Sequence, residues 1–328
     1  MSIEQERVGG SQSYRYEFDH RPEGVELELD WLITNQCNFS CIYCYPQIKA
    51  RIKSPAEFEK RPPEEVVEAI NSLGKRTHAI ISGGEPFMYP KFVDFAQLFT
   101  EKDHYLSIYT NFSTRNIYDF ADRINPERVA NLFPAFHSLE RQNRDGHGSV
   151  EEYINKVVYC QNRGFNVHGI YVLHPTVVDR ASTEVAMLKT AGVRSINLKI
   201  FKGVYEGAQY PEAYAEAAGE IFSETKSLYP HNEPYIEGKR NFQGKKCDAG
   251  RRFVKIEPNG DVFRCASIPE RYGNIYSGDP IVLDGEPRPC TAKRVLTLTN
   301  CLSYLVDFNT SESSKSQPTE TAVNINGQ

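Results

Sequence analysis

Segments with the character of strands alternate with segments with the character of helices from about residue 29 to residue 228. This alternation is typical of a parallel sheet built from strand–helix units. Six units are apparent, which is about three-quarters of the eight units of a closed barrel. The sequence therefore predicts an α/β fold in which a partial (β/α)6 barrel is favoured over a doubly wound sheet, with ligands at the carboxyl ends of the strands.

Each predicted element rests on apolar spacing and on local start and stop signals. The best-marked helix begins at the capping box of Ser149 and Glu152 and closes at Gly164. The predicted strands are residues 29–34, 78–82, 105–110, 132–136, 166–173 and 195–201. The predicted helices are residues 62–73, 90–101, 149–163, a segment that ends at Gly192, and residues 211–228.

Four segments are expected along the chain. Residues 1–28 form an N-terminal extension, residues 29–230 form the partial barrel, and residues 231–308 form a smaller second domain in which the periodicity changes. Residues 309–328 are rich in Ser, Thr, Glu and Asn, and such a segment cannot offset the entropy that is lost on ordering. We therefore expect a disordered tail there.

Composition argues against several classes of partner. The net charge is −5 and no basic block occurs, so no nucleic-acid partner is expected, because phosphate contacts need clustered Lys and Arg. The sequence has no secretory signal and no run of 18 apolar residues, so we expect a cytoplasmic protein with no membrane partner. Eight cysteines are too sparse for a disulfide scaffold in a chain of 328 residues, which indicates metal binding or catalysis.

Cys37, Cys41 and Cys44 lie within eight residues, in the loop expected after the first strand. Thiolates are soft ligands suited to iron–sulfur clusters, and closely spaced cysteines let a single loop enclose a cluster. Three thiolates leave one iron of a four-iron cluster open to a reacting ligand. The alternative is a structural zinc site, but zinc prefers four ligands and no fourth Cys or His lies close in the sequence.

The C-x-x-x-C-x-x-C pattern, with Tyr43 before the last cysteine, resembles the radical S-adenosylmethionine (SAM) superfamily. The resemblance implies a 4Fe-4S cluster on Cys37, Cys41 and Cys44 that binds SAM through its amino and carboxylate groups. It also implies reductive cleavage of SAM to a 5′-deoxyadenosyl radical, which abstracts hydrogen from a substrate carbon, with electrons from a reductant such as flavodoxin or ferredoxin. In such enzymes the cofactor supplies the difficult chemistry and the protein orients it.

A second motif follows the second predicted strand, where Gly83, Gly84 and Glu85 resemble the GGE motif of the same superfamily. Glycines let a backbone approach a ligand closely, and a carboxylate accepts hydrogen bonds from an ammonium group. The resemblance implies that these three residues bind the amino group of the methionine moiety of SAM. Read alone, they would equally suit a tight turn between a strand and a helix.

Further cofactor contacts are expected at Tyr43 and at the ends of two predicted strands. Thr110 and Asn111 end the third strand, and Ser138 follows the fourth. Similar positions in the superfamily hold polar groups near the ribose and the carboxylate of SAM. The alternative is that these residues are ordinary polar groups that cap turns.

Two cysteines flank a predicted C-terminal hairpin whose turn is Asn259–Gly260. This segment resembles the start of the SPASM and twitch domains, which hold auxiliary iron–sulfur clusters in this superfamily. The chain lacks the dense cysteine run that would supply a second such cluster, so one auxiliary 4Fe-4S cluster is implied. Its ligands would be Cys247, Cys265, Cys290 and Cys301. Zinc on the same four thiolates is the alternative.

The predicted reaction is a radical modification of a peptide, by oxidation, cross-linking or epimerisation, because SPASM-like and twitch-like segments most often accompany peptide substrates. The alternatives are dehydrogenation or another C–H modification of a small molecule such as a sugar or aminocyclitol and, in another class, a non-catalytic iron–sulfur electron carrier. Too few residues precede the first strand for a separate leader-recognition domain, and no cobalamin-binding segment precedes it. No catalytic residue is assigned. Candidate proton or hydrogen donors are His137, Glu140, Tyr171, His174, Lys199 and Tyr205.

Overall fold

The computed structural model describes residues 22–44, 57–201, 203–210, 212–214, 242–278 and 280–293, together with Tyr304 and Val306. The domain boundary expected near residue 230, most of the predicted helix 211–228 and the tail expected at 309–328 lie outside these residues. No helix in the described ranges is long and apolar enough to cross a membrane.

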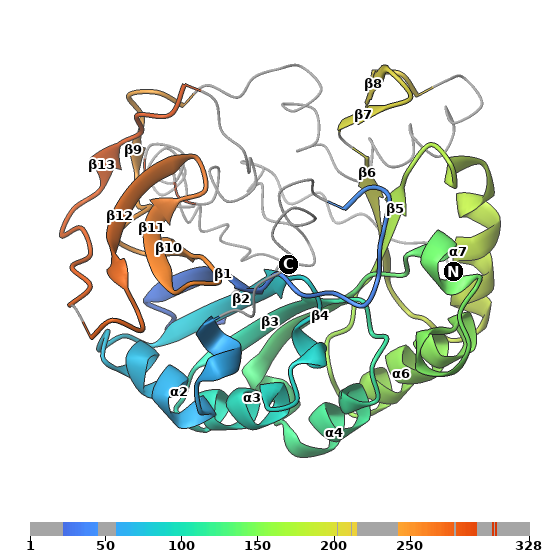
Figure 1. Cartoon of the computed structure of the whole chain (residues 1–328), viewed down its shortest axis with the longest axis horizontal. Helices are drawn as coiled ribbons and strands as arrows, with labels where there is room; N and C mark the ends of the chain where they lie inside the picture. The colour runs from blue at the N-terminus through green and yellow to red at the C-terminus, as the bar shows by residue number, and fades with distance from the viewer. Residues whose placement is uncertain are drawn as a thin grey trace, which may run out of the picture.

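The chain forms a curved sheet with helices along its outer side (Figure 1). Seven strands make the main sheet, in the order β12-β11-β10-β1-β2-β3-β4. The first four barrel strands are parallel neighbours, namely β1 (Leu27–Thr34), β2 (Thr77–Gly83), β3 (Tyr105–Thr110) and β4 (Val129–Pro134). The arc continues through isolated bridges into β5 (Gly169–Leu173), which pairs in parallel with β6 (Ile196–Ile200). The predicted α/β fold with a partial barrel is confirmed.

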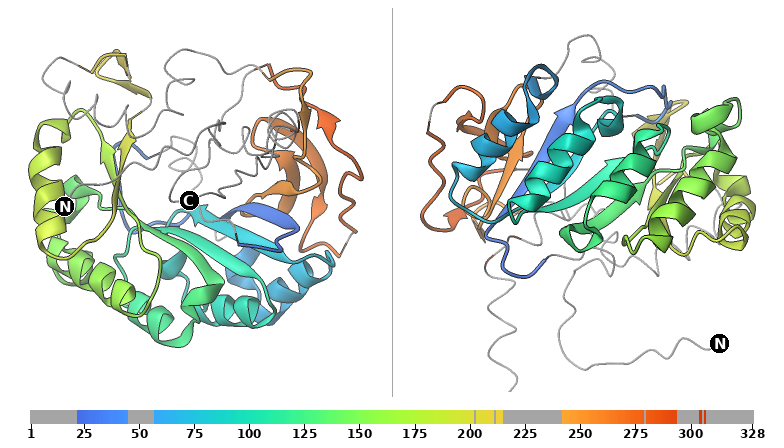
Figure 2. Two further views of the ribbon diagram at one scale, coloured as in Figure 1. Left: turned by 180° about the vertical axis from the view of Figure 1, so that it is seen from behind. Right: turned by 90° about the horizontal axis from the view of Figure 1, so that it is seen from below.

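Helices follow the strands and cover the outer, convex face of the arc (Figures 1 and 2). The α-helices are α2 (Pro63–Asn71), α3 (Phe92–Glu101), α4 (Asn116–Arg123), α5 (Ser138–Arg141), α6 (Val150–Asn162) and α7 (Ala181–Thr190). The 3-10 helices are η1 (Glu57–Lys60), η2 (Pro86–Met88), η3 (Pro126–Arg128), η4 (Gly146–Gly148) and η5 (Val178–Arg180). The predicted capping of α6 is confirmed, because the Ser149 side chain accepts a hydrogen bond from the backbone of Glu152.

Alternation along β1 decides which face of the sheet meets the helices. Leu29 and Trp31 are buried, and the Trp31 ring meets Phe58 and Phe95 edge to face. Successive side chains of a strand point to opposite faces, so Asp30 lies on the opposite, concave face. The main apolar core of the molecule therefore lies between the sheet and its helices.

The C-terminal hairpin extends the barrel sheet. Its strands β10 (Phe253–Ile256), β11 (Asp261–Cys265) and β12 (Ile268–Asn274) run on from β1, with β10 parallel to it. Seen from behind, these strands continue directly from β1 (Figure 2). Val254 and Ile256 belong to the same apolar core as the barrel strands. The segment expected to form a second domain thus shares both a sheet and a core with the barrel.

Several boundaries differ from the predicted ones. β1 begins two residues earlier than expected, β4 spans 129–134 where 132–136 was predicted, and β5 is shorter than the predicted 166–173. Helix α4 was not predicted, because its eight residues carry only three buried side chains between many polar ones. The turn of the C-terminal hairpin was predicted at Asn259–Gly260. In the structure the Gly260 backbone N–H donates to the Glu257 carbonyl, so the turn has four residues and Pro258 and Asn259 are its central ones.

Short strand pairs complete the described elements. β7 (Gly203–Tyr205) and β8 (Ala208–Tyr210) form an antiparallel hairpin after β6. β9 (Lys246–Cys247) pairs antiparallel with β13 (Arg288–Pro289) and so brings two distant C-terminal segments together.

Asp30, on the concave face of β1, gives a prediction about pH. It lies in register with Lys255 of β10. Burial raises the pKa of its carboxyl from 3.8 to about 6, although Lys255 opposes the shift. A carboxyl whose pKa is higher in the folded state favours folding less as pH rises from about 4 to about 6. We predict that Asp30→Asn is as stable as the parent at pH 4 and more stable by about 2–3 kcal/mol at pH 8.

Unfolding midpoints of both proteins at pH 4 and pH 8 test this prediction. Asp119→Asn is the matched control, because Asp119 is half-exposed on α4 and forms a surface ion pair with Arg123, so its effect should stay within about 0.5 kcal/mol at either pH. An Asp30→Asn protein that is less stable than the parent at pH 8 would mean that the ionised carboxylate is stabilised in place.

Candidate functional site

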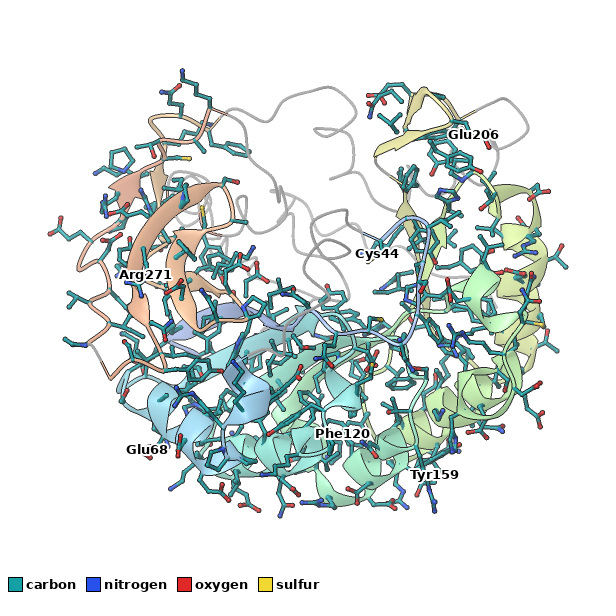
Figure 3. The ribbon with its side chains drawn as sticks, in the orientation of Figure 1. Cys44, Glu68, Phe120, Tyr159, Glu206 and Arg271 are labelled. Carbon is teal, nitrogen blue, oxygen red and sulfur yellow. The ribbon has the colours of Figure 1, made fainter. Side chains whose placement is uncertain are left out.

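The three cysteines of the C-x-x-x-C-x-x-C motif lie on the loop that leaves the carboxyl end of β1. Cys44 lies on the concave side of the arc, whereas Glu68 and Tyr159 lie on its outer helices (Figure 3). None of the three thiols belongs to a disulfide in the described part of the chain. They are close enough that Cys44 contributes to raising the pKa of both Cys37 and Cys41. The structure thus brings the predicted ligands together.

The chemistry of this thiol set fits an iron–sulfur cluster. Burial first, and neighbouring anions second, raise the pKa of Cys37 to about 11 and that of Cys41 to about 12. Such thiols become thiolates when a metal supplies positive charge. No group of three or more His, Cys, Asp or Glu side chains in the described ranges is placed to hold a single metal ion. Three thiolates suit a four-iron cluster with one iron open to a ligand, whereas a structural zinc ion takes four protein ligands.

A set of amide and hydroxyl side chains fastens the cysteine loop to the end of β3. The Asn111 side-chain amide donates to Asn38 Oδ1 at 2.9 Å and also lies 3.7 Å from Cys37 Sγ. The Asn38 amide in turn donates to Ser113 Oγ at 2.8 Å, and the Ser113 backbone N–H donates to Asn111 Oδ1 at 2.9 Å. Asn111, predicted to contact SAM, therefore lies beside the first cysteine and orders its loop.

Gly83 and Gly84 let the end of β2 dock against the cysteine loop. The backbone N–H of Gly84 donates to the Thr34 carbonyl at 2.8 Å, and that of Glu85 donates to the Gln36 carbonyl at 2.7 Å. A Cβ atom on Gly83 would lie 2.2 Å from the Thr34 carbonyl oxygen, and one on Gly84 would lie 1.9 Å from the Gln36 carbonyl oxygen. Both positions therefore require glycine for close backbone packing. Their contact with SAM stays a prediction.

The Glu85 carboxylate is fully buried between the ends of β2 and β3. It accepts hydrogen bonds from the Phe87 backbone at 3.0 Å, from Thr110 Oγ1 at 2.7 Å and from the Asn111 backbone at 2.5 Å. Burial raises its pKa to about 7, and these three hydrogen bonds oppose the shift. Glu85 and Thr110, both predicted to contact SAM, here join the two strand ends on which the cysteine loop rests. Their contact with SAM also stays a prediction.

A fully buried arginine, Arg141, ties the strand ends together beneath the cysteine loop. Its guanidinium also lies over the ring of Phe39, a residue of that loop, at 5.3 Å. Burial lowers its pKa to about 10, so it stays charged at neutral pH. Its hydrogen-bond acceptors are the backbone carbonyls of Asn111, Ala135, Phe136, Gly148 and Ser149. Arginine suits this task because its planar group carries five donors.

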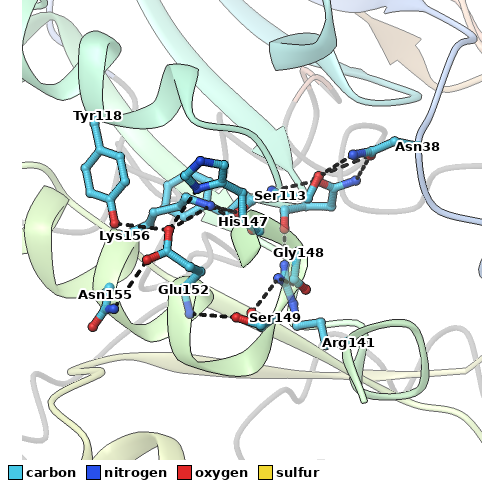
Figure 4. A network of polar contacts seen from close by, with 12 residues as sticks. Asn38, Ser113, Tyr118, Arg141, His147, Gly148, Ser149, Glu152, Asn155 and Lys156 are labelled. Carbon is cyan, nitrogen blue, oxygen red and sulfur yellow. Dashed lines mark hydrogen bonds and ion pairs between the residues drawn. The ribbon is translucent and has the colours of Figure 1, made fainter. Parts of the chain in front are cut away.

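Lys156, on α6, is a second buried cation that binds backbone carbonyl groups (Figure 4). Its ammonium group donates to the carbonyl of Phe112 at 3.2 Å and to that of His147 at 2.7 Å, with Glu152 at 3.6 Å. Burial lowers its pKa to about 8. Two internal cations therefore hold the carbonyl groups of the loops that carry the candidate site.

Tyr43 lies between two histidines at the mouth of the barrel. Its ring is stacked at 5.8 Å from His137 and tilted at 5.4 Å from His174. The Nδ1 atom of His137 is 2.9 Å from the Tyr43 hydroxyl and 3.4 Å from Cys41 Sγ. Burial lowers the pKa of His137 to about 3, so its ring is neutral. His174 also contacts Tyr205 at 4.6 Å, which places three of the candidate donor residues in one aromatic row.

Ser138 is buried and linked to the start of α7. Its hydroxyl accepts from Arg180 at 2.7 Å and donates to Glu184 at 2.9 Å, and the Tyr171 hydroxyl donates to the same carboxylate at 2.6 Å. The predicted contact between Ser138 and SAM is not tested by this arrangement. The structure does show that the residue belongs to a polar group joining α5, β5 and α7.

A second set of thiols gathers at the far end of the sheet. Cys247 and Cys290 are buried in one small apolar cluster, and Cys265 packs against it. Burial, with smaller contributions from the charges of the other two thiols, raises the pKa of Cys247 to about 11, although Arg264 opposes the shift. The buried Arg264 fixes the surrounding backbone by donating to three carbonyl groups. Three of the four predicted auxiliary ligands thus lie together, and Cys301 lies outside the described residues.

Sequence reasoning found the thiols and the GGE motif but missed the groups that hold them. Arg141, Lys156 and Arg180 were not singled out, because a lone cation in a helical segment usually faces solvent. Asn38 was missed for a related reason, since an amide between two cysteines has no pattern of its own. Asn38, Arg141 and Arg180 follow strand ends within a few residues, which was the signal that sequence offered for them, whereas Lys156 lies in the middle of α6.

Comparison with known proteins was made for the sequence and for the fold. The radical SAM superfamily model matches residues 31–188. The mycofactocin maturase MftC of Mycobacterium ulcerans (strain Agy99) is 29% identical over 116 residues, which are 35% of this chain and 28% of the maturase. This chain therefore matches well under two thirds of that relative's length.

Two solved structures share the fold. The structure of anSMEcpe with bound AdoMet is similar with a TM-score of 0.52 at 16% identity, covering 76% of this chain and 78% of that chain. Streptococcus suis SuiB is similar with a TM-score of 0.50 at 13% identity, covering 79% of this chain and 63% of SuiB. At these identities the likeness is one of architecture.

Proposed function

Because the radical SAM superfamily model matches residues 31–188, we propose that this chain is a radical SAM enzyme that modifies a peptide. The observation that carries the proposal is the trio of thiols on the loop after β1, which glycine packing and buried cations hold at the mouth of the barrel. Cys37, Cys41 and Cys44 would hold the 4Fe-4S cluster. The family uses this cluster with SAM, and together they supply a 5′-deoxyadenosyl radical.

The residues around the loop have separable tasks in this proposal. Gly83 and Gly84 let β2 approach the loop, and Glu85 joins β2 to the end of β3. Tyr43, His137 and His174 lie beside the cysteine loop, where they would shield the reacting atoms from water. Hydrogen abstraction would take place on the concave side of the arc, where Cys44 lies (Figure 3).

The C-terminal thiols support an auxiliary cluster in the same enzyme. Cys247, Cys265 and Cys290 lie together in an apolar setting, and Cys301 would be the fourth ligand. Because β10 pairs with β1, this site is joined to the barrel through a continuous sheet. An auxiliary cluster would accept the electron that a substrate radical loses, which fits an oxidation or a cross-link.

Similar proteins favour a peptide as the substrate. A structure of anSMEcpe contains AdoMet and the Cp18Cys peptide, and a structure of SuiB contains its precursor peptide SuiA. The relative matched in sequence is named a maturase. These names concern other proteins, and they support the peptide over a sugar or aminocyclitol as the class to test first.

The test uses the anaerobically reconstituted protein with SAM and dithionite. Synthetic peptides copied from the short reading frames that flank the gene are added one at a time, and both peptide mass and 5′-deoxyadenosine are measured. We expect one peptide to change mass, with formation of 5′-deoxyadenosine in proportion. Formation of 5′-deoxyadenosine that responds only to added sugars or aminocyclitols would overturn the peptide assignment, and its absence under all conditions would favour an electron carrier.

A further inference from the structure

His137 has an uncommon backbone conformation at the end of β4. Its φ is +47° and its ψ is +59°, in the left-handed region that residues other than glycine seldom occupy. Histidine tolerates this region better than most residues, but the conformation persists only where the surroundings hold it. The surroundings here are two aromatic rings of the cysteine loop, with Phe39 edge-on at 5.8 Å and Tyr43 stacked at 5.8 Å. The chain therefore turns sharply at the point that brings this imidazole to the thiols.

One ring nitrogen of His137 faces both a cluster ligand and a phenol. Nδ1 lies 3.4 Å from Cys41 Sγ and 2.9 Å from the Tyr43 hydroxyl oxygen. When Cys41 binds iron its sulfur carries no proton and is anionic, so a lone pair on Nδ1 would repel it. The contact with the sulfur is therefore attractive only if Nδ1 carries a proton. That proton would be shared between the sulfur and the phenol oxygen.

We propose that His137 is a positioning residue that donates its Nδ1–H to the Cys41 thiolate and thereby raises the reduction potential of the cluster bound there. Hydrogen bonds to ligand sulfurs favour the more negative, reduced cluster. Tyr43 moderates the effect, because its oxygen competes for the same proton. The inference rests on the proposed function, since it needs a cluster on Cys37, Cys41 and Cys44.

Three variants separate this role from a purely structural one. His137→Gly removes the donor and suits the left-handed backbone, so it isolates the hydrogen bond from strain. His137→Asn also tolerates that backbone and places an amide donor near the position of Nδ1. Tyr43→Phe keeps the ring but removes the competing oxygen, so the Nδ1–H of His137 can donate its hydrogen bond to the sulfur alone.

The measurement is a redox titration of the reconstituted proteins followed by electron paramagnetic resonance, without SAM. The signal of this cluster is identified as the one that changes when SAM is added afterwards. We expect His137→Gly to lower the equilibrium constant for reduction about tenfold, which is about 59 mV for one electron. His137→Asn should stay near the parent, and Tyr43→Phe should shift the potential in the opposite direction to His137→Gly.

The outcomes distinguish this inference from the proposed function. A parent protein that binds no SAM-sensitive cluster would contradict the proposed function. A parent with such a cluster, whose potential is unchanged in both His137→Gly and Tyr43→Phe, would overturn only the role of His137. If His137→Gly fails to hold iron, the comparison of Tyr43→Phe with the parent decides. A reduction potential that is unchanged or lowered in Tyr43→Phe would contradict the proposal that the sulfur and the phenol share the Nδ1 proton.

Discussion

Gly84→Ala is expected to unfold the cysteine loop and abolish cluster binding. The added Cβ would lie 1.9 Å from the Gln36 carbonyl oxygen and 2.9 Å from the Asn35 carbonyl carbon, and both are backbone atoms. Relief requires the end of β2 to separate from the loop, with loss of the hydrogen bond from Gly84 to Thr34. We expect a destabilisation of more than about 4 kcal/mol, a size reserved for severe steric or core defects. Thermal unfolding and iron content after reconstitution measure the two effects.

Gly285→Ala is the control for this substitution. A Cβ on Gly285 meets no atom of the described residues within 4 Å, and the backbone there is not in the left-handed region, so the effect should stay within about 0.5 kcal/mol. A Gly84→Ala protein that binds iron like the Gly285→Ala protein would contradict the claim that this glycine sets the packing of the cysteine loop.

Arg141→Met is expected to destabilise the fold by about 3–5 kcal/mol, the size found when one partner of a buried charged network is removed. The methionine side chain has similar length but leaves buried carbonyl groups at the ends of β3 and β4 without a donor. The substitution also removes the positive charge of Arg141, which lowers the pKa of the buried Glu85. We expect a lower unfolding midpoint, which circular dichroism on heating measures, and weaker retention of iron.

Arg163→Met is the matched control for Arg141→Met. Arg163 forms an exposed ion pair with Asp122, and such pairs contribute at most about 1 kcal/mol. Arg141→Lys adds a second comparison, because it keeps the charge but lacks the planar set of donors, and we expect an intermediate loss. Equal midpoints for Arg141→Met and Arg163→Met would show that the buried arginine does not hold the strand ends.

The predictions of the barrel and of the first thiol site rested on local sequence patterns. The alternation of strands and helices, the capping of α6 and the spacing of Cys37, Cys41 and Cys44 are all readable within a few residues, and the structure agrees with each. The GGE motif was also readable. Its packing role was not, because the contact of Gly84 with Gln36 joins residues almost fifty positions apart.

Long-range pairing accounts for most of what the sequence left open. The strand β10 pairs with β1 although more than two hundred residues separate them, and periodicity cannot indicate such a partner. Buried charges were hidden for another reason. Arg141 and Lys156 have the local sequence of surface residues, and only the carbonyl groups around them explain their burial. Sequence alone therefore located the candidate thiols better than it located the groups that hold them.

The most direct test of the account is formation of 5′-deoxyadenosine by variants of the three loop cysteines. Reconstituted Cys37→Ala, Cys41→Ala and Cys44→Ala proteins are incubated without oxygen with SAM and dithionite, beside Cys160→Ala, which removes a buried thiol of α6 that is remote in sequence from both thiol sets. We predict no product above the protein-free background for the three loop variants and parent-like product for Cys160→Ala. Parent-like amounts of 5′-deoxyadenosine from any loop variant would contradict the assignment of the cluster to these cysteines.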